Sequence, residues 1–202
     1  MAEWKLVPDA VPYVSTAEFH ADRERAPHLE QPWHRPRLET AAGFVRGIAA
    51  EWLHDATVSD LGCGDGGLLS LLKDCPDVAA SWGYDFSPAN AAGWTERGVQ
   101  ALALDVFGAD RGQVRFGDIT VMTEVLEHVA DPRRELRTAA EHSRYLVCSS
   151  PWNERPGNHS PEHAWAWDLD GYRSMIESCG WNVLQQEPVG LFQVVMAIAV
   201  SG

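Results

Sequence analysis

The sequence predicts a doubly wound α/β fold, with a mostly parallel sheet, helices on both faces and an antiparallel hairpin at the C-terminal edge. Segments with strand patterning alternate with helical segments from residue 57 to residue 179, which is typical of a parallel sheet. The last two expected strands, Asn182–Gln186 and Phe192–Val200, are separated only by Glu187–Leu191. That connection is too short for a crossover helix, so these two strands should pair as a hairpin.

The first 36 residues differ from the rest, because they hold four prolines ahead of Pro36 and three histidines. We expect an irregular N-terminal cap at 1–36, with one helix around Thr16–Arg25, over a single domain at 37–202. The domain should begin with a helix at Arg37–His54, where apolar residues recur at helical spacing.

The alternating elements then follow in chain order. The expected strands are Thr57–Leu61, Ala80–Asp85, Val99–Leu104, Asp118–Thr123 and Tyr145–Ser149. The expected helices are Leu68–Lys73, Pro88–Arg97, Pro132–His142 and Leu169–Cys179. Gly180 should cap the last of these, and Glu124–Val129 should start a further short helix. A long aromatic loop is expected at 151–167.

Composition narrows the range of partners and compartments. Lys and Arg total 16 against 29 Asp and Glu, a net charge of −13, which opposes a nucleic-acid partner. The four cysteines form no CxxC pair, which excludes a zinc ribbon and favours a reducing compartment. The longest apolar run, Val194–Val200, is far too short to span a membrane, so we expect a soluble cytoplasmic protein.

The most informative stretch is DLGCGDGG at 60–67, which runs from a strand through a tight turn into a helix. Its glycines satisfy GxGxxG, and Asp85 follows the last of them by 18 residues, as in nicotinamide-binding folds. Taken alone, that pattern supports an NAD-dependent oxidoreductase. Asp60 changes the interpretation, because a carboxylate directly before the loop suits a cationic ligand better than a pyrophosphate.

Five segments carry a family resemblance as an ordered set. They are DLGCGDGG (60–67), GYDFSPAN (83–90), ALDVF (103–107), DITVMTEVLEH (118–128) and YLVCSSP (145–151). In this order they resemble the class I S-adenosylmethionine-dependent methyltransferases, over about residues 40–200. The resemblance implies a Rossmann-like, seven-stranded sheet and S-adenosylmethionine as the cofactor.

The resemblance also implies which residues bind that cofactor: Asp60, Gly62, Cys63, Gly64, Asp85, Phe86, Asp105, Val106 and Thr123. Gly62 and Gly64 would let the backbone approach the methionine part and the ribose. Asp60 would lie near the amino end of the ligand. Asp85 would accept from both ribose hydroxyls, and Asp105 from the adenine amine.

A cluster of candidate metal ligands follows the fourth expected strand. Glu124, Glu127 and His128 stand at positions i, i+3 and i+4, which share one face of the expected short helix. Two carboxylates and an imidazole suit Mg²⁺ or Mn²⁺. The turn also lies outside the carboxyl end of a strand, where open α/β sheets bind their ligands.

The aromatic loop supplies further candidate metal ligands. His159 and His163 precede Trp165 and Trp167 there. An ExxEH segment with a later histidine–tryptophan segment is similar to the small-RNA 3′-terminal 2′-O-methyltransferases. That resemblance implies that a divalent ion is held by Glu124, Glu127, His128 and His163. The chain resembles ubiquinone-type small-molecule O-methyltransferases equally well in size. Asn158 stands where the RNA-directed enzymes would have an arginine, which puts an RNA substrate in doubt.

A metal-free site stays open, since many class I enzymes carry a similar turn without an ion. A bound ion would lower the pKa of a substrate hydroxyl and hold it in line with the methyl–sulfur bond. Without an ion, a histidine must take the proton. The catalytic candidates are His163, His159 and His128, with His34 as a further base.

Two other features of the irregular segments remain without an assigned role. Four tryptophans lie in these segments: Trp33, Trp152, Trp165 and Trp167. They either form a lid over the carboxyl ends of the strands or pack the loops against the domain. A run of arginines alternates with acidic residues, which is typical of a solvated face: Arg23, Arg25, Arg35 and Arg37. A carboxylate or phosphate on the substrate would give these arginines a purpose.

The sequence therefore predicts an S-adenosylmethionine-dependent methyltransferase acting on a hydroxyl, or less readily an amine, of a small molecule. Three alternatives stay open: an RNA 3′-terminal 2′-O-methyltransferase, an NAD-dependent oxidoreductase and a non-catalytic cofactor-binding module. The acceptor and the oligomeric state are not encoded in any recognisable pattern.

Overall fold

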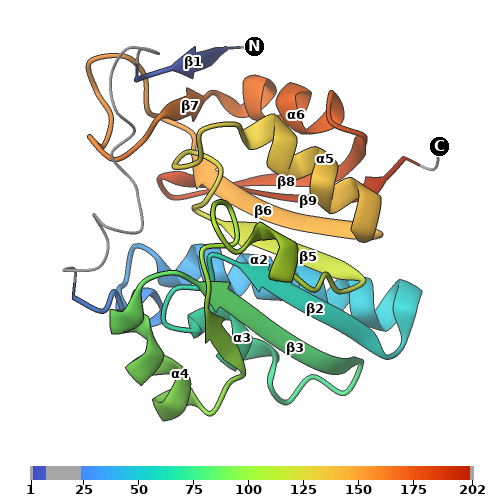
Figure 1. Ribbon diagram of the computed structural model, residues 1–202. Helices are drawn as coiled ribbons and strands as arrows, with labels where there is room; N and C mark the ends of the chain where they lie inside the picture. The colour runs from blue at the N-terminus through green and yellow to red at the C-terminus, as the bar shows by residue number, and fades with distance from the viewer. Residues whose placement is uncertain (1, 8–23, 201–202) are drawn as a thin grey trace.

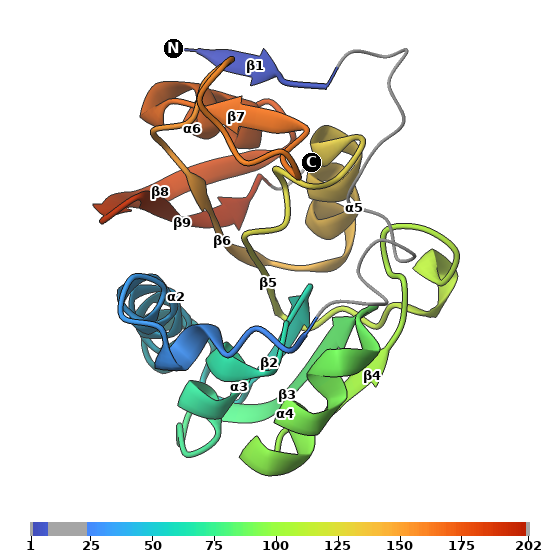
Figure 2. The ribbon, with the colours of Figure 1, turned by 90° about the vertical axis from the view of Figure 1, so that its left-hand side faces the viewer.

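The computed structural model describes residues 2–7 and 24–200, and its centre is a seven-stranded sheet between two layers of helices (Figures 1 and 2). The strand order is β4-β3-β2-β5-β6-β9-β8. Its strands are β2 (Ala56–Leu61), β3 (Val78–Asp85), β4 (Ala101–Ala103), β5 (Ile119–Thr123), β6 (Tyr145–Pro151), β8 (Trp181–Val189) and β9 (Phe192–Ala199). The first five of these run parallel, and β9 lies antiparallel to both β6 and β8. The predicted doubly wound sheet and its C-terminal hairpin are confirmed.

Helices cover both faces of the sheet. They are α2 (Arg35–Ile48), α3 (Gly67–Leu72), α4 (Ala91–Arg97), α5 (Pro132–His142) and α6 (Leu169–Glu177). Helices α2 and α3 pack in one apolar cluster, and α5 and α6 pack in the other. Helix α2 continues into a π-helical turn, Ala49–Leu53, so the predicted first helix begins two residues early and ends less regularly. Among the described residues, no helix has both the length and the apolar character needed to cross a membrane.

Strand β6 shows why helices must cover both faces of the sheet. All seven of its residues are buried. Tyr145 and Val147 face the cluster under α2 and α3, whereas Leu146 and Cys148 face the cluster under α5 and α6. Alternate side chains of a strand point to opposite faces, so such a continuous apolar run is stable only between two helical layers.

A second, two-stranded sheet was not predicted. Strand β1 (Glu3–Lys5) pairs antiparallel with β7 (Trp165–Trp167), and both lie beside α6 (Figures 1 and 2). The expected irregular segment at 1–36 and the aromatic loop therefore each contain a strand. Three-residue strands show no readable alternation, and their pairing joins residues about 160 positions apart. The helix expected around Thr16–Arg25 falls mostly on residues outside the described ranges.

The expected short helix at Glu124–Val129 is wrong, because this segment is a turn. Glu124 has a positive φ of 57°, and its amide donates to the carbonyl of Ser149 on β6 at 3.1 Å. The carbonyl of Glu127 accepts from the amides of Ala164 and Trp165 at 2.7 and 3.2 Å. Bonds to β6 and to the aromatic segment thus replace the bonds that would have formed a helix.

The strand order turns at β2, which lies between β3 and β5. The connections from these neighbouring strands leave in opposite directions, so a crevice opens at their carboxyl ends. The glycine turn follows β2, and the Glu124–Val129 turn follows β5. The fold therefore brings the two predicted functional segments to the same edge of the sheet.

Candidate active site

A cavity of about 830 Å³ lies at the carboxyl ends of the parallel strands. Eight of the nine predicted cofactor residues line it: Asp60, Gly62, Cys63, Gly64, Asp85, Phe86, Asp105 and Thr123. The ninth, Val106, instead packs in the core under α5 and α6, where it is 4% exposed. A volume of this size suits a nucleoside-sized ligand together with a small second molecule.

Gly62 shows how closely the glycine turn after β2 approaches the Glu124–Val129 turn after β5. Its φ is +80°, and a Cβ built on it would lie 2.5 Å from Cγ2 of Val125, the residue after Glu124. A side chain here would be strained and would clash. The amides of Gly62 and Cys63 both donate to the carbonyl of Tyr84, at 2.8 and 2.9 Å, which fixes the turn against β3.

Asp85, at the end of β3, accepts hydrogen bonds from its own chain. Its Oδ2 accepts from the Gly64 amide at 2.9 Å. Its Oδ1 accepts from the Ser87 amide at 2.8 Å and from Nδ2 of Asn90 at 3.1 Å. This carboxylate therefore holds the glycine turn in shape before any ligand arrives.

Asp60 has the opposite environment. The residue is 1% exposed, and neither carboxylate oxygen has a hydrogen-bond partner among the described residues. Burial raises its pKa to about 7, helped by the charge of Asp85 and opposed by that of Arg37. A buried acid in this state gains stability from a ligand cation.

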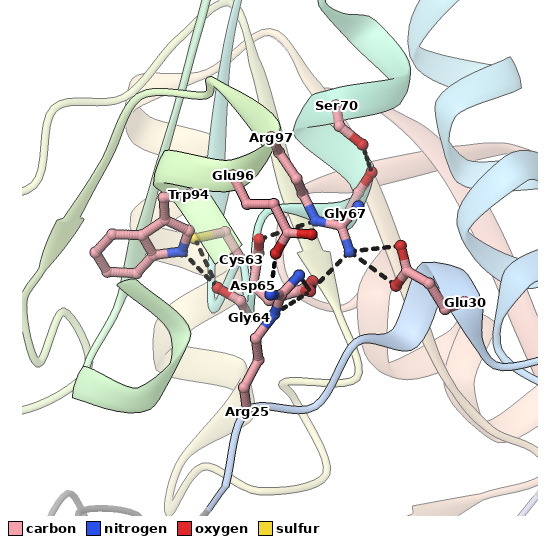
Figure 3. Close-up of polar contacts among 10 residues, drawn as sticks. All are labelled: Arg25, Glu30, Cys63, Gly64, Asp65, Gly67, Ser70, Trp94, Glu96 and Arg97. Atoms are coloured by element: carbon pink, nitrogen blue, oxygen red, sulfur yellow. Dashed lines mark hydrogen bonds and ion pairs between the residues drawn. The ribbon is translucent and has the colours of Figure 1, made fainter. Parts of the chain in front are cut away.

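Asp65, inside the glycine turn, ties that turn to the N-terminal segment (Figure 3). Arg97 of α4 donates to Asp65 Oδ2 at 2.7 Å and to both oxygens of Glu30 at 2.8 and 2.9 Å. Arg25 donates to the same Asp65 oxygen at 3.0 Å and also pairs with Glu96. The solvated face predicted for Arg25 is therefore wrong, because its guanidinium pairs with the buried carboxylate of Asp65.

Asp105 lies at the far end of the cavity, beyond β4. Its amide donates to Asp110 Oδ2 at 2.9 Å, and its own Oδ2 accepts from the Ala109 amide at 3.3 Å. The loop therefore holds Asp105 at the cavity wall through its own turn.

The two glutamates lie beyond β5, where Glu127 is buried and Glu124 is half-buried. Ser149 donates to Glu124 Oε1 at 2.9 Å. Glu127 is fully buried, and among the described residues neither of its carboxylate oxygens has a partner. Burial raises the pKa of both carboxyls, and the neighbouring charge of Glu124 raises that of Glu127 further. A buried carboxylate beside a second carboxylate is costly unless a proton or a cation neutralises the pair.

Glu127, His128 and His163 come together, with one ligand atom from each lying within 4.8 Å of the others. The two imidazole rings meet edge to face, with centroids 4.6 Å apart. His128 Nδ1 lies 3.2 Å from the Glu162 carbonyl, and His163 Nδ1 lies 2.5 Å from Glu154 Oε2. These acceptors favour a proton on each Nδ1, so each Nε2 carries the lone pair that a metal requires.

Three of the four predicted metal ligands are thus brought within reach of one ion, and Glu124 borders them. The donor set of carboxylates and imidazoles fits a borderline divalent ion such as Mn²⁺. Sequence reasoning missed Glu154, because nothing in its local sequence marks it as a partner of His163.

The other histidines lie apart from this cluster. His159 Nδ1 lies 2.8 Å from the Ser160 carbonyl, and His159 does not line the cavity. His34 lines the cavity, where it stacks between His28 and Phe192. Burial, and then the charge of Arg37, lower the pKa of His34 to about 4. His34 is therefore neutral at physiological pH but a weak base.

Comparison with known proteins decides the family. The family model described as a methyltransferase domain matches residues 32–186, more than half of the chain. The chain belongs to this methyltransferase family. It is a class I S-adenosylmethionine-dependent methyltransferase, as its glycine turn and sheet order indicate. No curated protein matches the chain at a significant level.

Solved structures share the fold of this methyltransferase at low sequence identity. The 1,6-didemethyltoxoflavin-N1-methyltransferase of Burkholderia thailandensis is 17% identical, with a TM-score of 0.67 over 96% of this chain and 93% of its own. The methyltransferase domain of bacterial CtHen1 is also 17% identical, with a TM-score of 0.62 over 82% and 99%. An O-methyltransferase family protein from Burkholderia thailandensis is 16% identical, with a TM-score of 0.65 over 83% of this chain. This methyltransferase spans only 56% of that protein's length.

Proposed function

We propose that this methyltransferase transfers the methyl group of S-adenosylmethionine to a hydroxyl of a small molecule, assisted by a divalent ion, Mg²⁺ or Mn²⁺. One observation carries the metal assistance: the buried carboxylate of Glu127 has no partner among the described residues and lies beside two imidazoles. The residues that would hold the ion are Glu124, Glu127, His128 and His163. When bound there, such an ion supplies a positive charge that lowers the pKa of a substrate hydroxyl.

The proposed cofactor position follows the strand ends. Asp105 and Asp85 would bind the adenine and ribose, and Asp60 would bind the protonated amino group, whose charge matches this buried acid. The sulfonium would then lie near Thr123 and the glutamate turn, since β2 and β5 are neighbours. An acceptor hydroxyl beside Glu124 would then lie close to the methyl group that is transferred.

The remaining residues orient and enclose the acceptor. Glu154 would hold the ring of His163 in one tautomer and orientation through the 2.5 Å contact. Residues Ala26, His28, Trp33 and His34 line the cavity from the N-terminal side. We infer that residues 24–36 of the predicted cap cover this side of the domain at 37–202 and limit water around the reacting groups, whereas residues 8–23 lie outside the described ranges.

Two other functions have specific support. An RNA 3′-terminal 2′-O-methyltransferase would use the same four ligands, but the net charge of −13 opposes a phosphate backbone. A metal-free enzyme would use His163 as the base with Glu154 as its orienting carboxylate, since that pair is already formed. An amine acceptor that is neutral at the working pH would need neither the ion nor the base, because its nitrogen already carries the attacking lone pair.

Turnover with and without the ion tests the proposal. The metal-stripped enzyme would be supplied with labelled S-adenosylmethionine and, separately, a catechol, a vicinal diol, an amine and an oligoribonucleotide. We expect label on a small hydroxyl acceptor with Mn²⁺, and its loss with a chelator. Equal turnover of the hydroxyl acceptor under both conditions would overturn the metal assistance and favour a metal-free enzyme, and label only on the oligoribonucleotide would establish the RNA-directed function.

A further inference from the structure

Glu3 on β1 joins helix α5 to the buried last residue of β7. Arg133 of α5 donates from both terminal nitrogens, to Oε1 of Glu3 at 2.8 Å and to Oε2 at 2.9 Å. The indole Nε1 of Trp167 donates to the same Oε2 at 2.9 Å, and Trp167 is fully buried. Paired bonds between a guanidinium and a carboxylate fix direction as well as distance. The Glu3 carboxylate therefore sets where β1 lies against the rest of the chain.

Strand β1 lies beside β7 and α6, and hydrogen bonds attach it at both of its ends (Figures 1 and 2). At one end, the Leu6 amide donates to the Ala164 carbonyl at 2.8 Å, just before β7 begins. At the other end, the Ala2 amide donates to Asp168 Oδ1 at 2.8 Å, and the Asp168 amide donates to the Ala2 carbonyl at 3.1 Å. A Cβ built on Gly171 would overlap that carbonyl oxygen, so α6 leaves room for β1 there.

The segment that β1 holds is also bonded to the turn after β5. The amides of Ala164 and Trp165 donate to the Glu127 carbonyl at 2.7 and 3.2 Å, and Nε1 of Trp165 donates to the Val129 carbonyl at 3.1 Å. His163 directly precedes Ala164 in the chain. The position of β7 therefore determines how His163 lies relative to the turn that carries Glu127.

We propose that Glu3 is a positioning residue of the active site: by fixing β1 and β7, it holds His163 in place against Glu127. Glu3 does not line the cavity, so it acts on the site only through β7. The groups of a metal or catalytic site must be held within roughly 0.5 Å of their working geometry, which makes support from outside the site effective. The proposal rests on the proposed function in that Glu127 and His163 are the groups that assist methyl transfer.

The side-chain bonds of Glu3 should decide whether β1 stays docked. Strand β1 has only three residues, and a two-stranded sheet is at best marginally stable by its own pairing. Glu3 and Arg133 keep 26% and 34% of their side chains exposed, so loss of their ion pair should lower the global free energy of unfolding only slightly. Local opening of β1 and β7 is a separate equilibrium, which the same loss can shift strongly. A defect in the site can therefore be distinguished from a defect in the fold.

Metal affinity measured beside cofactor affinity tests the proposal on the full chain. Competition with a metal-sensitive dye gives the affinity for Mn²⁺, and calorimetry gives the affinity for S-adenosylhomocysteine. We expect Glu3→Gln to bind Mn²⁺ about 3- to 10-fold more weakly than the unaltered protein, a smaller loss than for a group that touches a metal ligand directly. Its affinity for S-adenosylhomocysteine should not change.

Two further variants make this comparison specific. Glu177→Gln is the matched control, because Glu177 forms an exposed ion pair with Arg173 within α6 and should change neither affinity. Arg133→Gln leaves the bond from Trp167 to Glu3 in place, so it should weaken Mn²⁺ binding in the same direction but by less. Equal losses of Mn²⁺ and S-adenosylhomocysteine affinity in Glu3→Gln would mean that Glu3 supports the fold and not the site, which would overturn the proposal.

Hydrogen–deuterium exchange on the metal-free protein separates failure of this proposal from failure of the metal proposal. The amides of Ala164 and Trp165 report the contact with Glu127, because they donate to its carbonyl. We expect them to exchange about fivefold faster in Glu3→Gln than in the unaltered protein or Glu177→Gln, with unchanged exchange in the central sheet. If the unaltered protein binds no Mn²⁺, the metal proposal fails and exchange alone decides this one. Unchanged exchange at the two amides, or equal Mn²⁺ binding by Glu3→Gln and an unaltered protein that binds the ion, would overturn it.

Discussion

Asp85 and Glu127 are both acids at the carboxyl ends of the parallel strands, but they differ in the hydrogen bonds that the chain gives their carboxylates. Asp85 accepts three hydrogen bonds from the chain around it. Glu127 is fully buried, and neither of its oxygens has a partner among the described residues. The glycine half of the site is therefore built by the chain itself, whereas the glutamate–histidine half is left for a ligand to complete.

This difference has an energetic consequence. An acid that accepts bonds from the folded chain contributes to stability, whereas a buried acid without partners reduces it. The same change from acid to amide should therefore have opposite signs in the two environments. Asp60 behaves like Glu127 in this respect, because its oxygens also lack partners among the described residues.

The largest effect is expected for Asp85→Asn. The amide would place N–H groups against the donors of Gly64, Ser87 or Asn90, so at least one bond to a charged acceptor is lost. We expect the free energy of unfolding of the ligand-free protein to fall by about 3 kcal/mol. Urea unfolding followed by tryptophan fluorescence measures it, with the exposed Asp74→Asn as control. A change no larger than the control's would contradict the comparison.

Asp60→Asn should act in the opposite direction. The pKa of Asp60 is about 7 in the folded chain against an ordinary 3.8, so the folded state binds this proton more tightly than the unfolded state. The associated stability is fully present below about pH 4 and is lost as the pH rises to about 7. We expect the variant to be more stable than the unaltered protein at pH 8, by about 2 kcal/mol, and to show a flatter pH profile. Equal profiles for the two proteins would show that Asp60 is not an unsatisfied acid in the folded chain.

Glu154→Gln tests the contact between Glu154 and His163, which supports the glutamate–histidine half from outside the ligand cluster. Glutamine cannot provide the carboxylate charge beside His163, so the affinity for Mn²⁺ should fall about 10- to 100-fold while the fold is kept. Competition with a metal-sensitive dye measures the affinity, and Glu141→Gln on the exposed surface of α5 is the control. Unchanged Mn²⁺ affinity would mean that the Glu154 carboxylate does not support metal binding through His163.

The smallest effect is expected for Glu30→Gln in the ion-pair network of Figure 3. Glu30 has half of its side chain exposed, and Arg97 keeps its bond to the buried Asp65. We expect a loss of less than about 1 kcal/mol in unfolding free energy. A loss of several kcal/mol, measured by the same urea titration, would show that the N-terminal segment is integral to the glycine half.

The glycine half, which the chain builds by itself, is also the half of the site that the sequence predicts. The glycine turn and the acids near the carboxyl ends of β2, β3 and β4 are local patterns with fixed spacing, so their positions follow from the sequence. The glutamate–histidine half depends on contacts between distant segments. The turn at Glu124 forms because β6 and the aromatic segment supply its bonds, and Glu154 meets His163 only across a loop. The burial of Arg37 likewise follows from the packing of α2, although its sequence neighbours are typical of a solvated face.

The most direct test is a calorimetric titration of Mn²⁺ into metal-stripped protein saturated with S-adenosylhomocysteine, with Glu127→Gln and Glu141→Gln in parallel. The account predicts saturable binding at one site per chain, retained in Glu141→Gln and lost in Glu127→Gln. Absence of binding to the unaltered protein, or equal binding by both variants, would contradict it and would leave a histidine-based methyltransferase.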